Sequence, residues 1–187
     1  IHLCFAALRQ SRSAAEIGRA RIGSPSRYRP RSSANAAIEA YRGLAPAEIA
    51  WDEATAPEFI TNRMIPNGFV DPAVPFLAIR RLDRTPVAYL VNFSAHPTTL
   101  GAWNTRLSAD YPGVVMREVE RRFPGAVCLF FAGAVGDQAP AKHGSREALT
   151  ERIGQALARQ VVTLVETAHP TPPRGVAALQ EQMPLPP

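Results

Sequence analysis

The pattern of hydrophobic and polar positions is clearest in the second half of the chain. "FLAIRRL" (76–82) and "PVAYLVNFSA" (86–95) are apolar runs separated by "DRT". This arrangement predicts two strands joined by a tight hairpin. "PGAVCLFFAGA" (124–134) is a continuous apolar run, which is typical of a central strand covered on both faces.

Two segments of this half have helical periodicity. The first, "SADYPGVVMREVERRF" (108–123), can be capped by Ser108 or Asp110. Its apolar residues fall near helical spacing at Val114, Val115, Val119 and Phe123. The second, "SREALTERIGQALARQVVTLVETA" (145–168), has a serine in the cap position and apolar residues at 149, 153, 157, 161 and 164. Both patterns predict amphipathic helices.

The first half has weaker patterns. Residues 1–22 suggest a strand end followed by a short helix, and "SANAAIEAYRGL" (33–44) predicts a short helix that ends at its glycine. We interpret residues 20–75 as a basic and irregular connection ahead of an α/β core at 76–187. Residues 45–75 in particular are rich in Pro, Asn and Asp and are predicted to be a long irregular segment.

The order strand 87–95, helix 111–122 and strand 126–133 predicts a β-α-β unit with parallel strands. Together with the hairpin, it predicts an α/β fold with a mixed, partly parallel β-sheet flanked by helices. The 187 residues suit one domain better than two. The chain starts without a methionine and ends on a strand-like run, so we expect an incomplete domain that is truncated at both ends.

Composition and charge narrow the function classes. No run approaches the roughly 20 apolar residues of a membrane span, so we expect no transmembrane segment. The net charge is +5, and seven arginines lie within residues 9–31. Such an arm can bind phosphate backbones, but it lacks regularly interleaved aromatic residues. A solvated or internally paired arm is favoured, with no nucleic-acid partner. Cys4 and Cys128 are interpreted as free buried thiols, which leaves the redox compartment open.

The β-α-β order also brings polar residues together. Parallel strands end at the same edge of a sheet, where ligands of open α/β folds bind. The loop after the first strand carries His96, Thr98, Thr99 and Asp110, and the loop after the second carries Asp137 and Gln138. Each of these residues also has a simpler structural explanation, as a turn histidine, a helix cap or part of a sharp glycine turn.

Three motifs follow one another in the chain, "NFSAHPTTLG", "LSADYPG" and "CLFFAGAVGDQAP", with "GSPSRYRPRSSANAAIEAYR" ahead of them. In this order they resemble the catalytic domain of the neutral/alkaline (non-lysosomal) ceramidase family, and the resemblance covers most of residues 20–170. It implies that residues 1–187 are part of one catalytic domain of a zinc-dependent amidohydrolase. It also implies a Zn²⁺ cofactor, a small-molecule amide or lipid substrate such as N-acylsphingosine, and a secreted or periplasmic location.

The resemblance also assigns residues. His96 matches a zinc-ligating histidine, and Asp110 matches the aspartate of the family's "S-G-D" stretch, written "S-A-D" here. The loop "GDQAP" (136–140) matches the family's "G-D-V-S-P" loop, whose serine acts at the reacting carbonyl. The predicted site is therefore His96 as metal ligand, Asp137 and Gln138 as catalytic residues, and Thr98, Asp110 and Gly136 as substrate-binding residues.

The chain departs from the family pattern at two points. Ala139 stands where the family has its serine, so no hydroxyl is available at that position. The family's remaining zinc ligands have no counterparts here and are expected outside this chain, which predicts that the fragment alone is inactive. The alternative is a catalytically silent relative that binds a lipid or glycan in the same cleft. The sequence leaves the oligomeric state open.

Overall fold

The computed structural model describes residues 2–3, 30–141, 145–172 and 179–182. Its centre is a five-stranded sheet with the order β1-β2-β4-β5-β6, and β3 pairs with β7 in a small second sheet. The strands are β1 (His2–Leu3), β2 (Ala45–Thr55), β3 (Ile60–Asn62), β4 (Ala73–Arg81), β5 (Pro86–Phe93), β6 (Val127–Ala132) and β7 (Gln138–Pro140). The helices are α2 (Pro30–Arg42), η2 (Pro57–Phe59), α3 (Asp110–Arg122) and α4 (Arg146–Thr167).

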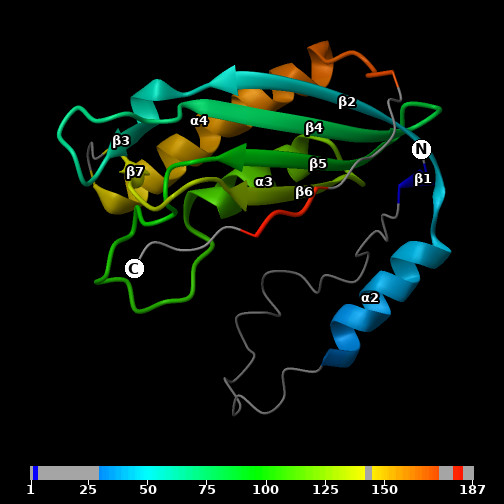
Figure 1. Ribbon diagram of the computed structural model, residues 1–187, viewed down its shortest axis with the longest axis horizontal. Coiled ribbons are helices and arrows are strands. Elements are labelled where there is room, and N and C mark those ends of the chain that lie inside the picture. Colours follow the sequence, from blue (N-terminus) through cyan, green and yellow to red (C-terminus); the bar gives the residue numbers. More distant parts are fainter. Residues whose placement is uncertain (1, 4–29, 142–144, 173–178, 183–187) are drawn as a thin grey trace.

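The large sheet is mixed, as predicted. Strand β4 is antiparallel to both β2 and β5, whereas β5 and β6 are parallel and are connected through α3. Helices α3 and α4 lie together on one face of this sheet (Figure 1). The predicted α/β fold, with a partly parallel sheet flanked by helices, is therefore confirmed. So is the hairpin of β4 and β5, whose turn places Arg84 at a φ of 66°.

The core lies between this sheet face and the two helices. Its largest fully buried side chains are Val74, Phe76, Tyr89, Val91 and Phe93 from the sheet, Tyr111, Val115 and Val119 from α3, and Ile153, Leu157 and Val161 from α4. The positions predicted for the apolar stripe of the second helix are all buried. Cys128 is a free buried thiol, as predicted, and burial raises its pKa to about 12, with the neighbouring Glu120 adding to the rise.

Helices α3 and α4 approach each other closely at Gly154. A Cβ atom placed on Gly154 would lie 2.3 Å from Val114 Cβ and 2.9 Å from the Tyr111 carbonyl oxygen. Distances this short leave no room for any side chain, because atoms in protein interiors are already close-packed. Gly154 therefore sets how near α4 approaches the first turns of α3.

The interpretation of residues 45–75 as irregular is wrong. Residues Ala45–Thr55 form β2, which pairs with β4 from Ala47↔Arg81 to Thr55↔Ala73. Its sequence, "APAEIAWDEAT", alternates between less and more exposed positions, but its proline and acidic residues hide this period of two. Pairing with the strongly apolar β4 overrides the weak local preference for a strand.

The expectation of a central strand at 126–133 is also wrong. Among the described strands, β6 is at the edge of the large sheet, and Phe131 is 49% exposed. A continuous apolar run indicates burial on two faces but does not reveal how many neighbouring strands pair with it.

The helix starts differ in detail from the predicted caps. Ala109 occupies the cap position of α3, and Asp110 is the first helical residue. Ser108 still contributes, because its Oγ accepts the Asp110 N–H at 3.0 Å. Ser145 is the cap residue of α4, as predicted, but its side chain makes no capping hydrogen bond.

Several expectations for the first third fall outside the described residues. They include the short helix before residue 22, the environment of Cys4 and nearly all of the arginine-rich arm. The helix predicted at 33–44 is confirmed as α2. Among the helices that the structure describes, none is both long and apolar enough to cross a bilayer.

Candidate active site

The carboxyl ends of β5 and β6 lie at the same edge of the sheet, because the two strands are parallel (Figure 1). His96 follows β5, and the loop to β7 follows β6. A backbone hydrogen bond joins the two segments, with the His96 N–H donating to the Gln138 carbonyl oxygen at 3.2 Å. The prediction that these two loops meet is therefore confirmed. We call this end of the sheet the site edge.

His96 is held in place by its own turn. Its carbonyl oxygen accepts hydrogen bonds from the Thr98 N–H at 2.7 Å and from the exposed Thr98 hydroxyl at 3.2 Å. The ring nitrogen Nδ1 is buried and has no hydrogen-bond partner among the described residues. A buried nitrogen without a partner is costly. Among the described side chains at the site edge, that of His96 therefore has a buried polar atom for which a bound group could provide the missing partner.

Gln138 is buried, with 4% of its surface exposed, and both ends of its amide are bonded. Its Oε1 accepts the Asp71 N–H at 2.6 Å, and its Nε2 donates to the Ala134 carbonyl oxygen at 3.0 Å. The side chain therefore connects the β6–β7 loop to the segment that leads into β4. A direct catalytic role for Gln138 stays a prediction, and the contacts described here are positioning contacts.

Asp137 is exposed, and its carboxylate is oriented by Asn62, whose Nδ2 donates to Oδ2 at 3.0 Å. Asn62 is itself fixed, because its Oδ1 accepts the N–H groups of Met64 and Ile65, each at 2.9 Å. Asp137 is therefore an accessible carboxylate in a defined position, and its catalytic role stays a prediction.

Gly136 contributes its backbone. Its carbonyl oxygen accepts two hydrogen bonds from the Arg63 side chain, through Nε at 2.9 Å and Nη2 at 2.5 Å. The Arg63 N–H also donates to the Asp137 carbonyl oxygen at 2.7 Å. Arg63 thus clamps the loop that carries two of the predicted site residues.

Sequence reasoning did not single out Asn62 or Arg63. Both belong to the segment that was interpreted as an irregular connection, and they lie 75 and 73 residues from their partners Asp137 and Gly136. The adjacent Asn and Arg just before a turn were the available signal. The contacts of Asn62 and Arg63 with residues 136 and 137 depend on the pairing of β3 with β7.

Ser94 lies just beyond β5 and is also part of this region. It is 1% exposed, and its Oγ donates to Asp71 Oδ2 at 2.9 Å. A Cβ atom on Gly133 would lie 2.4 Å from this Oγ, so the backbone after β6 passes directly over the serine. Ser94 is therefore buried and hydrogen-bonded to Asp71, so a substrate has no access to its hydroxyl.

Asp110 fastens the site edge to the helices. Its Oδ1 accepts the Thr99 hydroxyl at 2.6 Å and the Tyr111 N–H at 2.8 Å, and its Oδ2 accepts the Leu100 N–H at 3.2 Å. Thr99 Oγ1 also lies 2.5 Å from Thr150 Oγ1 of α4. Substrate binding by Asp110 stays a prediction, whereas its bracing role is directly visible.

Tyr111 adds a second brace behind His96. Its hydroxyl donates a hydrogen bond to the carbonyl oxygen of Ala95. Burial raises the pKa of this hydroxyl well above its usual range, and the nearby Asp110 carboxylate adds to the rise. The hydroxyl therefore stays protonated, and α3 remains attached to the residue that precedes His96.

The described residues do not form a zinc site by themselves. A catalytic zinc needs three protein ligands and one open position. The described part of the chain contains no group of three His, Cys, Asp or Glu side chains that could hold a metal ion. His96, with its unpartnered buried nitrogen, can supply one ligand. The other ligands must come from elsewhere if zinc binds here.

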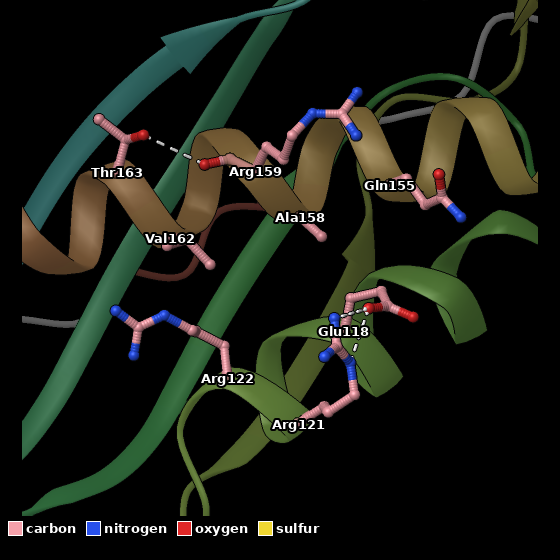
Figure 2. A pocket seen from close by; sticks show the side chains of 8 residues that line it. All are labelled: Glu118, Arg121, Arg122, Gln155, Ala158, Arg159, Val162 and Thr163. Carbon is pink, nitrogen blue, oxygen red and sulfur yellow. Dashed lines mark hydrogen bonds and ion pairs between the residues drawn. The ribbon is translucent and has the colours of Figure 1, made fainter.

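A groove of about 650 Å³ lies between α3 and α4, near the carboxyl ends of the helices rather than at the site edge. In Figure 2, Arg121 points toward Glu118, whereas Arg122 and Arg159 extend in different directions. Arg122 pairs with Glu166, and Arg121 with Glu118. The polar groups do not converge, so the groove lacks the arrangement of an active site.

The similarity of this chain to known proteins lies in its fold. No protein-family profile matches the chain, and a search of curated proteins finds no match. Solved structures do match. A structure described as ceramidase complexed with C2 is 16% identical, with a TM-score of 0.62 over 71% of this chain. The chain has the fold of part of a neutral ceramidase. Neutral ceramidase from Pseudomonas aeruginosa is 19% identical, with a TM-score of 0.59 over 72% of this chain.

The ceramidase resemblance stated from the sequence is thus confirmed at the level of the fold. The chain spans about a quarter of the length of these ceramidases, 24% of one and 25% of the other. Their activity, substrate and metal are therefore matters for proposal where this chain is concerned.

Proposed function

We propose that this chain is the His96-bearing part of a zinc-dependent amidohydrolase that cleaves the N-acyl amide bond of a ceramide-like lipid. The observation that carries the proposal is the fold shared with neutral ceramidases over about seven-tenths of the chain. The site edge supports it, because one of its loops holds a histidine whose buried Nδ1 has no partner among the described residues, and the adjoining loop holds an exposed carboxylate that Asn62 orients.

Each residue of the site edge has a separate role in this proposal. His96 supplies one metal ligand from the end of a rigid strand, and the other ligands come from polypeptide outside residues 1–187. A zinc ion held there would supply Lewis-acid chemistry, by polarising the amide carbonyl and activating a water molecule. In this proposal Asp137 accepts or delivers a proton, and the hydrogen bond from Asn62 orients its carboxylate. Arg63 and Gln138 hold the loop that positions it.

Ala139 favours a second candidate function. It lies in β7, opposite Thr61, at the position where the resemblance places a serine. Without that hydroxyl, the same cleft could bind an N-acyl lipid and leave it intact. A catalytically silent lipid-binding relative is therefore the alternative to the hydrolase.

Hydrolysis of N-acylsphingosine by a full-length protein that contains this chain tests the proposal. We expect the His96→Ala variant to lose about 100-fold or more of the activity, since losing a first ligand costs at least as much as losing a residue that supports one. His169→Ala is the control, because His169 is exposed and follows α4. Equal activity of the two variants would exclude His96 from the site. Lipid binding without hydrolysis in the unaltered protein would establish the alternative.

A further inference from the structure

Two loops at the site edge expose large apolar side chains to solvent. One loop connects β3 to β4 (63–72), and the other connects β5 to α3 (94–109). The exposed side chains, which we call the apolar tips, are Met64 at 71%, Ile65 at 61%, Phe69 at 81%, Trp103 at 80% and Leu107 at 91%. Single exposed apolar residues are common, but clusters of large ones mark interaction sites.

Both loops adjoin the same segment of the candidate site. The first begins at Asn62 and Arg63, which bond to Asp137 and Gly136. The second contains His96, whose N–H donates to the carbonyl oxygen of Gln138. Both project from the end of the sheet at which β5 ends (Figure 1). The apolar tips therefore flank residues 136–138.

The loops are held in defined turns. Asn62 Oδ1 accepts the N–H groups of Met64 and Ile65, and Asn62 Nδ2 donates to the Phe69 carbonyl oxygen at 2.9 Å. In the other loop, Asn104 Nδ2 donates to the Arg106 carbonyl oxygen at 2.8 Å. Side chains presented on fixed turns lose less conformational entropy on binding a surface.

The charged side chains within the two loops, next to the apolar tips, are basic. Arg63 and Arg106 lie within the loops, and residues 63–70 and 94–109 contain no Asp or Glu. Asp71 and Asp110 are engaged internally with Ser94 and Thr99, and the exposed carboxylate of Asp137 lies in the segment that the apolar tips flank. Large apolar and aromatic side chains can enter the boundary between the headgroups and the acyl chains of a bilayer. Arginines beside them can interact with the lipid phosphates.

We propose that the apolar tips form a membrane-contact surface that seats the site edge on a phospholipid bilayer. An N-acyl lipid could then pass from the bilayer toward His96 and Asp137 without full exposure to water. The delivery of substrate rests on the proposed function, whereas binding to the bilayer does not require catalysis.

Co-sedimentation with phosphatidylcholine vesicles, with and without phosphatidylserine, tests this surface. We expect the chain to bind vesicles, more strongly when phosphatidylserine is present. The Phe69→Ser/Trp103→Ser variant should bind about tenfold or more weakly, because two buried apolar side chains are lost. Leu82→Ser is the matched control. Leu82 is 68% exposed in the β4–β5 hairpin, at the opposite end of the sheet, and its replacement should leave vesicle binding unchanged.

A second measurement does not depend on how that variant folds. The chain has two tryptophans, Trp51 and Trp103, so Trp51→Phe leaves Trp103 as the only indole. Vesicles should shift its fluorescence to shorter wavelength. Binding that is equal in the loop variant and the control, or no shift of Trp103, would overturn the proposal. Vesicle binding without any hydrolysis by a full-length protein that contains this chain would contradict the proposed function and leave the membrane surface established.

Discussion

Replacing Gly154 with valine is expected to lower the free energy of unfolding by about 3 kcal/mol or more. The new Cβ would lie 2.3 Å from Val114 Cβ and 2.9 Å from the Tyr111 carbonyl oxygen. A backbone oxygen and a Cβ atom cannot rotate away, so α3 and α4 would have to separate where both pack on the sheet. Equilibrium unfolding in urea, followed by circular dichroism, measures the effect.

The matched control is the neighbouring residue of the same helix. Gln155 is exposed, so Gln155→Val introduces the same β-branched side chain with no collision. Its effect on the free energy of unfolding should stay within about 0.5 kcal/mol. If the two variants unfold at the same urea concentration, the close approach of α3 and α4 at Gly154 is wrong.

The Asp110→Ala variant is expected to lose about 3 kcal/mol of folding stability. Hydrogen bonds to a charged group contribute about 1.5–3 kcal/mol each, although such losses are not fully additive. The Asp110 carboxylate accepts three, and its removal leaves the buried Thr99 hydroxyl and the Leu100 N–H without this acceptor. Thermal and urea unfolding measure the loss.

Two companions make this test specific. Asp110→Asn keeps one acceptor oxygen and should fall between the wild type and Asp110→Ala. Glu53→Ala removes an exposed carboxylate from β2 and should change the free energy of unfolding by at most about 0.5 kcal/mol. Unchanged stability of Asp110→Ala, together with weakened substrate binding in an active full-length protein, would instead support the substrate-binding role predicted from the sequence.

The parts of the fold that the sequence predicts are those with strong periodicity. The stripe from Leu149 to Leu164 and the runs of β4, β5 and β6 appear where they were expected, because burial of one face dominates their local preferences. Strand β2 was missed because its proline and acidic residues suppress the alternation, and it exists through its pairing with β4.

The candidate site was predictable only in part. The β-α-β order is a local property of the sequence, and it correctly brings His96 to the loop of Gln138. The contributions of Asn62 and Arg63 depend on the pairing of β3 with β7, which joins segments more than 70 residues apart. One sequence carries no signal for such a pairing when both strands are three residues long.

The two loops of the site edge are held in place by different contacts. Asp110, Tyr111 and Thr99 attach the loop of His96 to α3 and α4. Asn62 and Arg63 attach the loop of Asp137 to the start of the β3–β4 loop. The result is a histidine and a carboxylate presented from two braced loops, and rigid support of this kind is what a functional site requires.

The measurement that tests the central claim most directly is the zinc content of a full-length protein that contains this chain. It should be measured by mass spectrometry after dialysis, alongside the His96→Ala and His169→Ala variants. We predict one zinc per chain in the unaltered protein and in His169→Ala, and a large loss in His96→Ala. Zinc retained at full occupancy in His96→Ala, or absent from all three proteins, would contradict the assignment of His96 as a metal ligand.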